Sequence, residues 1–136
     1  MASERSSIVV AEDHEAMRSY ITNLLQPGYN VIAAVGDGVL AVEAVIECHP
    51  DVAILDISLP RMNGFDVGRK IRELGLPTKI VFMSAEHLSA YLEFAQSLTA
   101  GYVLKNRLNS DLPMAIEEVL AGRTFGSMIS FAKTPP

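Results

Sequence analysis

The sequence has little cysteine, no tryptophan and no long apolar run. One cysteine, Cys48, cannot form an internal disulfide, and no charged and apolar leader precedes the first apolar run. No apolar run approaches the roughly 20 residues that cross a bilayer. We therefore expect a soluble protein in a reducing, cytoplasmic setting, with no membrane partner.

Basic residues are also few. The formal net charge is -5, and the 11 Lys and Arg residues are scattered along the chain. A scattered basic set argues against direct nucleic-acid binding by this chain. A protein or a small ion is the expected partner.

What is present is a repeating order of apolar runs and helical patterns. With 136 residues and 49% apolar residues, the chain is long enough for one domain with its own core. The repeat predicts five strands and five helices. The strands are expected at 8–11, 31–35, 52–55, 79–84 and 101–104, and the helices at about 17–25, 37–48, 64–74, 89–98 and 109–121.

Helix boundaries rest on capping residues. Asp37 is expected to cap the second helix, while Asn109, Ser110 and Asp111 offer caps to the last one, with Pro113 in its first turn.

Strands this apolar predict a parallel sheet buried on both faces by helices. The expected fold is α/β: a flavodoxin-like (βα)5 doubly wound sheet with strand order 2-1-3-4-5. We expect the domain at residues 7–122, a polar tail at 1–6, and a tail or the start of a linker at 123–136.

Carboxylates follow two strands that this order makes neighbours. Glu12 and Asp13 end the first strand, and Asp56 ends the third. Clustered carboxylates repel unless a cation joins them, and an all-oxygen set favours Mg²⁺. Asp13 could instead cap the first helix and Asp56 the turn that follows it.

Two further polar residues end the fourth and fifth strands. Ser84 and Lys105 are expected to face the same crevice, where a hydroxyl and a cation can hold an anion on Asp56. Taken singly, each has an ordinary reading, as a turn serine and a solvated surface lysine.

These positions, with the turn Leu59-Pro60-Arg61-Met62-Asn63-Gly64 after Asp56, resemble the receiver domain of bacterial two-component response regulators. The resemblance implies that Asp56 accepts a phosphoryl group from the phosphohistidine of a histidine kinase or phosphotransfer protein. It also implies Mg²⁺ bound by Asp13, Asp56 and the backbone carbonyl of Ser58, with Glu12 acting through water.

The same resemblance assigns the readout of the modification. Lys105 would pair with the phosphoryl oxygens, Ser84 would hydrogen-bond one of them, and Tyr102 would be the aromatic switch residue. Output, and possible homodimerisation, would use the fourth helix, fifth strand and fifth helix. Residues 101–105 and 121–125 look like the subfamily that carries a helix-turn-helix output domain.

Two rival functions stay open. An aspartate-nucleophile phosphohydrolase would want a second acid two residues after Asp56, where this chain has Ser58. A phosphorylation-independent interaction module could keep the same fold.

In receiver domains the lysine is usually followed by proline, and the bond between them is cis. Here Asn106 follows Lys105, so we predict a trans bond or an altered loop.

Overall fold

The computed structural model describes residues 5–127 of the chain. Residues 1–4 of the expected amino-terminal tail and 128–136 of the expected carboxy-terminal tail lie outside the described residues. The strands are β1 Ser7–Ala11, β2 Asn30–Val35, β3 Val52–Asp56, β4 Lys79–Ser84, β5 Gly101–Leu104 and β6 Phe125–Gly126. The helices are α1 Glu15–Leu25, α2 Gly38–Cys48, α3 Gly64–Glu73, α4 Ser89–Ser97 and α5 Leu108–Leu120, with a 3₁₀ turn at Lys105–Arg107.

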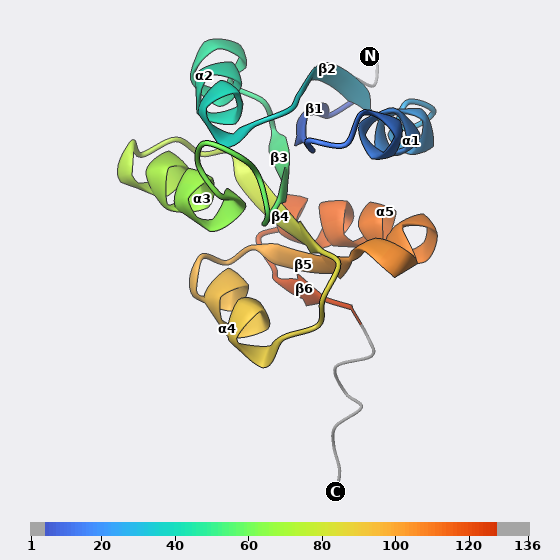
Figure 1. Cartoon of the computed structure of the whole chain (residues 1–136), viewed down its shortest axis with the longest axis vertical. Coiled ribbons are helices and arrows are strands. Elements are labelled where there is room, and N and C mark those ends of the chain that lie inside the picture. Colours follow the sequence, from blue (N-terminus) through green and yellow to red (C-terminus); the bar gives the residue numbers. More distant parts are fainter. Residues whose placement is uncertain (1–4, 128–136) are drawn as a thin grey trace, which may run out of the picture.

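The strands form one parallel sheet in the order β2-β1-β3-β4-β5-β6. In Figure 1, α1 and α5 cover one face of the sheet, and α2, α3 and α4 cover the other. The α/β class and the order 2-1-3-4-5 are therefore confirmed. The sixth strand was not predicted, because two residues are too short to give a periodic signal.

Alternating strand residues build two cores. Ala53 and Leu55 of β3 face the cluster under α2, α3 and α4, whereas Val52 and Ile54 face the cluster under α1 and α5. Successive side chains of a strand point to opposite faces, so one continuous apolar run serves both layers.

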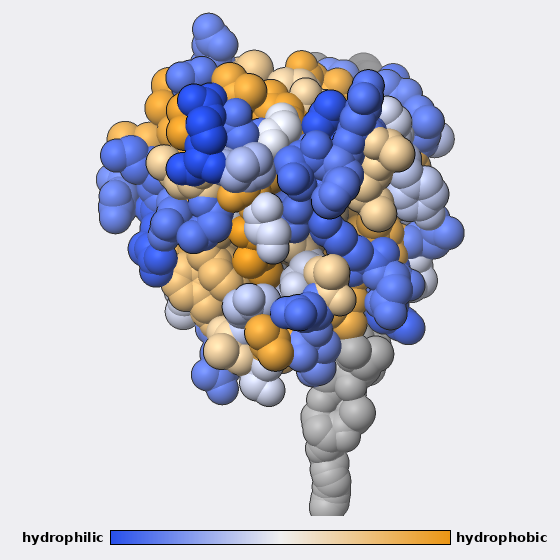
Figure 2. All heavy atoms as spheres, in the orientation of Figure 1, coloured by the Kyte–Doolittle hydropathy of each residue, from blue (hydrophilic) through white to orange (hydrophobic). Residues whose placement is uncertain are grey.

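The prediction of burial on both faces is wrong for β2. Its residues alternate between exposed and half-buried, because β2 lies at the edge of the sheet and pairs only with β1. Exposed apolar side chains occur elsewhere too, such as Leu40 and Ile46 on α2. Figure 2 shows hydrophobic patches between hydrophilic groups on one face of the molecule.

One helix start agrees with its expected cap and another differs. Asp37 does cap α2, since its side chain accepts a hydrogen bond from the Leu40 N–H. The last helix begins earlier than predicted, at Leu108, so the three expected capping residues and Pro113 all lie inside it. The preceding 3₁₀ turn starts the helical conformation early, which sequence signals at 109–111 did not reveal.

None of the helices among residues 5–127 is long and apolar enough to cross a bilayer.

Candidate functional site

Asp56 is the last residue of β3 and is 3% exposed. Its Oδ1 accepts a hydrogen bond from the Ser58 N–H at 3.2 Å, so Asp56 also caps the turn that follows β3. Gly64, at the start of α3, packs directly on it: a Cβ there would lie 2.2 Å from the Asp56 backbone oxygen. The Leu59–Gly64 turn thus holds the backbone of Asp56 by a contact that only glycine permits.

Lys105 joins two strand ends across the crevice. Its Nζ lies 2.8 Å from Glu12 Oε1 and 3.2 Å from Asp56 Oδ2. Glu12 is fully buried, and its Oε1 has no hydrogen-bond partner beyond this ammonium. The lysine side chain is itself 16% exposed, so the solvated-surface reading of Lys105 is wrong.

Burial and charge perturb both partners. Burial raises the pKa of the Asp56 carboxyl, the charge of Glu12 raises it further, and Lys105 and the Ser58 N–H oppose the rise. Burial alone would lower the pKa of Lys105, but its hydrogen bond to Glu12 and the charges of Asp56 and Glu12 raise it above its usual range. Lys105 is therefore a firmly protonated cation between two acids.

Asp13 lies apart from this bridge. It is exposed, it does not cap α1, and His14 takes the N-cap position without a side-chain capping bond. Among the described residues, Glu12, Asp13 and His14 form the one trio of potential metal ligands whose donor atoms all lie within 4.8 Å of one another. Asp56 is not part of this trio.

His14 and Arg18 also contact the acid pair. His14 Nδ1 lies 3.3 Å from Glu12 Oε2 and 3.5 Å from Asp13 Oδ1, and Arg18 donates to the Glu12 backbone carbonyl at 2.8 Å. His14 precedes the first residue of α1, and its side chain is 78% exposed. Arg18 was missed, because a single arginine on a helix carries no signal for a contact with the preceding loop.

Ser84 and Tyr102 meet on one carbonyl. Ser84 Oγ donates to the Glu86 backbone oxygen at 2.7 Å and accepts from the Glu86 N–H at 3.0 Å. The Tyr102 hydroxyl donates to that same oxygen at 2.7 Å. Tyr102 is 1% exposed. The serine hydroxyl is thus engaged by the loop after β4, with no hydrogen bond to Asp56, and the tyrosine ring is packed inward.

The lysine is followed by an altered loop. The residues that the structure describes contain no cis peptide bond, so the predicted trans bond between Lys105 and Asn106 is confirmed. These two residues and Arg107 form the 3₁₀ turn that leads into α5.

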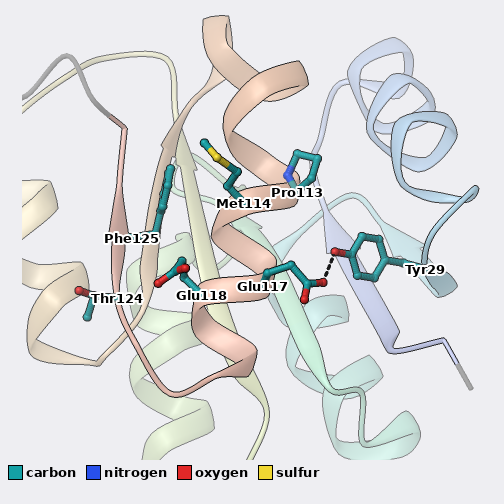
Figure 3. Close-up of a pocket in the computed structure, with 7 residues that line it drawn as sticks. All are labelled: Tyr29, Pro113, Met114, Glu117, Glu118, Thr124 and Phe125. Carbon is teal, nitrogen blue, oxygen red and sulfur yellow. Dashed lines mark hydrogen bonds between the residues drawn. The ribbon is translucent and has the colours of Figure 1, made fainter. Parts of the chain in front are cut away.

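An apolar groove lies away from these acids. It has a volume of about 410 Å³ and is bordered by Tyr29, Met114, Glu117 and Phe125. Figure 3 shows Tyr29 hydrogen-bonded to Glu117 on one side of α5 and Phe125 of β6 on the other. Glu12, Asp56 and Lys105 do not border it.

Comparison with known proteins gives one family. A model described as the response regulator receiver domain matches residues 8–117. The oxygen regulatory protein NreC of Staphylococcus epidermidis is 36% identical over 125 residues, which cover 89% of this chain and 57% of that protein. The chain thus spans little more than half the length of this curated relative.

Solved structures agree. A two-component response regulator of the LuxR family from Aurantimonas sp. SI85-9A1 is 31% identical with a TM-score of 0.85, covering 93% of this chain and 92% of the other. A DNA-binding response regulator of the LuxR family from Staphylococcus aureus is 30% identical with a TM-score of 0.79, covering 85% and 98%.

Proposed function

We propose that this chain, which belongs to the family of response regulator receiver domains, is a phosphorylation-dependent signalling switch with Asp56 as the phosphoacceptor. The family is regulatory and serves two-component signalling. The observation that carries the proposal is the Lys105 ammonium between Glu12 and Asp56. It holds a cation beside the acid that would receive a dianionic group.

The transfer follows from the position of Asp56. A carboxylate oxygen of Asp56 attacks the phosphorus of a phosphohistidine, so an O–P bond forms while the P–N bond breaks. The imidazole leaves with the bonding electron pair and takes up a proton. The phosphoryl group adds negative charge and acceptor oxygens, and Lys105 can follow these outward from its present contacts.

The acids fit Mg²⁺. The donors are oxygens, and the buried Glu12 carboxylate has only one partner for Oε1. We propose that Asp13, Asp56 and the backbone carbonyl of Ser58 hold the ion, with Glu12 acting through water. When bound, Mg²⁺ supplies positive charge that offsets the phosphoryl oxygens.

Ser84 and Tyr102 are proposed as the switch. In the unmodified state the Ser84 hydroxyl is held by Glu86. A phosphoryl oxygen on Asp56 offers that hydroxyl a charged acceptor, which is stronger than a neutral carbonyl. If the Ser84 hydroxyl turns to the phosphoryl group, the Glu86 carbonyl keeps only the hydrogen bond from the Tyr102 hydroxyl. The loop between β4 and α4 is then attached through the tyrosine and can change its conformation.

The partners follow from the family. We propose a histidine kinase or phosphotransfer protein as donor, output and possible homodimerisation through α4, β5 and α5, and a cytoplasmic location. Direct nucleic-acid binding by this domain is not proposed, because its net charge is negative. Residues 7–122 form the proposed receiver unit. It is a regulatory acceptor, in which transfer to Asp56 and later dephosphorylation are the only reactions expected.

Incubation with acetyl phosphate and Mg²⁺ tests the assignment. Intact-protein mass spectrometry is expected to show one added phosphoryl group on wild type and none on Asp56→Ala. Asp66→Ala is the matched control, because it removes an exposed aspartate and is expected to label like wild type. Equal labelling of Asp56→Ala, or no labelling of wild type, refutes the proposal. A partner that binds equally with and without labelled Asp56 favours a phosphorylation-independent module.

A further inference from the structure

The short strand β6 pairs with β5 on the proposed output face. Gly101 and Tyr102 are opposite Phe125 and Gly126 in the parallel register. Without β6, β5 would be an edge strand with unpaired backbone groups, which other chains can bind. Gly126 lets β6 lie close to α4, because a Cβ there would be 2.9 Å from Leu92 Cδ1.

Ser127, the residue after β6, is hydrogen-bonded to β5. It is 2% exposed. Its N–H donates to the Tyr102 carbonyl at 3.0 Å, and its Oγ accepts from the Leu104 N–H at 3.0 Å. The end of β6 is therefore bonded to β5 at the proposed switch tyrosine and at the residue that precedes Lys105.

A buried acid ties Ser127 to the turn that carries Lys105. Asp111 on α5 is 1% exposed. Its Oδ2 accepts from Arg107 Nε at 2.9 Å and its Oδ1 from Ser110 Oγ at 2.9 Å. Burial alone would raise the pKa of Asp111, but hydrogen bonds from Arg107, Ser127 and Ser110 lower it below its usual range. Asp111 is thus a carboxylate shared by α5, the 3₁₀ turn and the segment after β6.

These contacts form a continuous route from the phosphoacceptor to β6. Lys105 contacts Asp56 and opens the 3₁₀ turn that ends at Arg107. Arg107 holds Asp111, which hydrogen-bonds Ser127. If a displacement of Lys105 toward a phosphoryl group is carried to its backbone, the start of this turn would move, and with it the Arg107–Asp111 pair and the hydrogen bond from the Leu104 N–H to Ser127.

We propose that β6 is a phosphorylation-responsive latch on the edge of β5: it is closed when Asp56 is unmodified and is loosened when Lys105 moves to the phosphoryl group. The link between phosphorylation and β6 (the coupling) rests on the function proposed above. The attachment of β6 to β5 through Ser127 (the hold) does not. A two-residue strand has a short ladder with its neighbour, so β6 is a segment that can open locally without unfolding the sheet. Loosening exposes the β5 edge within the face proposed for output.

Amide hydrogen exchange by NMR on the full chain tests the latch. In unmodified protein, Ser127→Ala is expected to speed exchange at the Leu104 amide about tenfold, since that N–H loses its acceptor. Ser110→Ala is the matched control: it removes a hydroxyl bonded to Asp111 that does not touch β6, and it is expected to leave this exchange within about twofold of wild type. Unchanged exchange in Ser127→Ala refutes the hold.

The coupling is measured on wild type with acetyl phosphate and Mg²⁺. Labelling of Asp56 is followed by mass in the same sample. Faster exchange at the Leu104 and Ser127 amides on labelling, absent in Asp56→Ala, supports the latch. Labelled protein with unchanged exchange refutes the coupling while the proposed function stands. Absence of labelling refutes the proposed function and the coupling together, and leaves the hold to be judged by Ser127→Ala.

Discussion

Replacing Lys105 with methionine removes the one ammonium that contacts both Glu12 and Asp56. Methionine keeps much of the volume of the side chain, so the lost charge dominates the effect. The two carboxylates are 0% and 4% exposed in their side chains, and removing one partner of a buried ion pair costs about 3 to 5 kcal/mol. We expect the lower end, about 3 kcal/mol at pH 7, because Asp56 can take up a proton.

The pH dependence identifies the cause. Loss of Lys105 removes a charge that lowers the pKa of Asp56, so that pKa rises further in the variant. A carboxyl whose pKa is raised in the folded state favours folding when protonated, and this contribution is lost as pH rises through the folded-state pKa. The variant is therefore expected to lose least stability at about pH 5 and most at about pH 8.

Urea unfolding followed by circular dichroism measures this at both pH values. Lys70→Met on α3 is the matched control, because Lys70 is exposed, and it is expected to change stability by no more than about 0.5 kcal/mol. At pH 7, Lys105→Met should also lower the melting temperature by roughly 10 °C. A loss no larger than that of Lys70→Met, or one that is equal at the two pH values, contradicts the charge-bridge reasoning.

Three other variants test the site. Asp56→Asn is expected to raise the urea midpoint, more at pH 8 than at pH 4, because the ionised carboxylate is disfavoured by burial and by Glu12; an equal gain at both pH values contradicts this cause. Gly64→Ala should lose about 2 kcal/mol or more in thermal unfolding, since its Cβ meets the Asp56 backbone, whereas Gly28→Ala, with open space around it, should stay near wild type. Millimolar Mg²⁺ is expected to raise the melting temperature of wild type and, by the proposed ligand set, to have less effect on Asp13→Asn; equal shifts argue against Asp13 as a ligand.

The elements that sequence predicted best are those with a strong local signal. The fourth strand was placed at 79–84, the range the structure has, because an unbroken apolar run ends in a serine there. The second helix was placed from the Asp37 cap to residue 48, and the structure agrees at both ends. These signals depend on neighbouring residues, so no tertiary information is needed to read them.

Elements that depend on distant partners were missed or misplaced. The two-residue β6 exists because Ser127 and Gly126 meet β5 and α4. The start of α5 was placed late because its polar residues look like caps, while Asp111 is in fact buried against Arg107 and Ser127. Exposure of β2 also depends on its position at the sheet edge, which composition does not reveal.

For the candidate site, the sequence alone predicted the sheet order, which the structure confirms, and proposed the residues. The order of the strands follows from local patterns and the handedness of crossovers, and it brings the acids, Ser84 and Lys105 to one end of the sheet. Tertiary structure decided which of them touch: Lys105 bridges Glu12 and Asp56, Asp13 stands with His14, and Ser84 and Tyr102 share the Glu86 carbonyl. Strand order determines which strand ends lie next to each other. Hydrogen bonds and ion pairs depend on atomic positions to within about an ångström, and in loops these positions are determined only by packing.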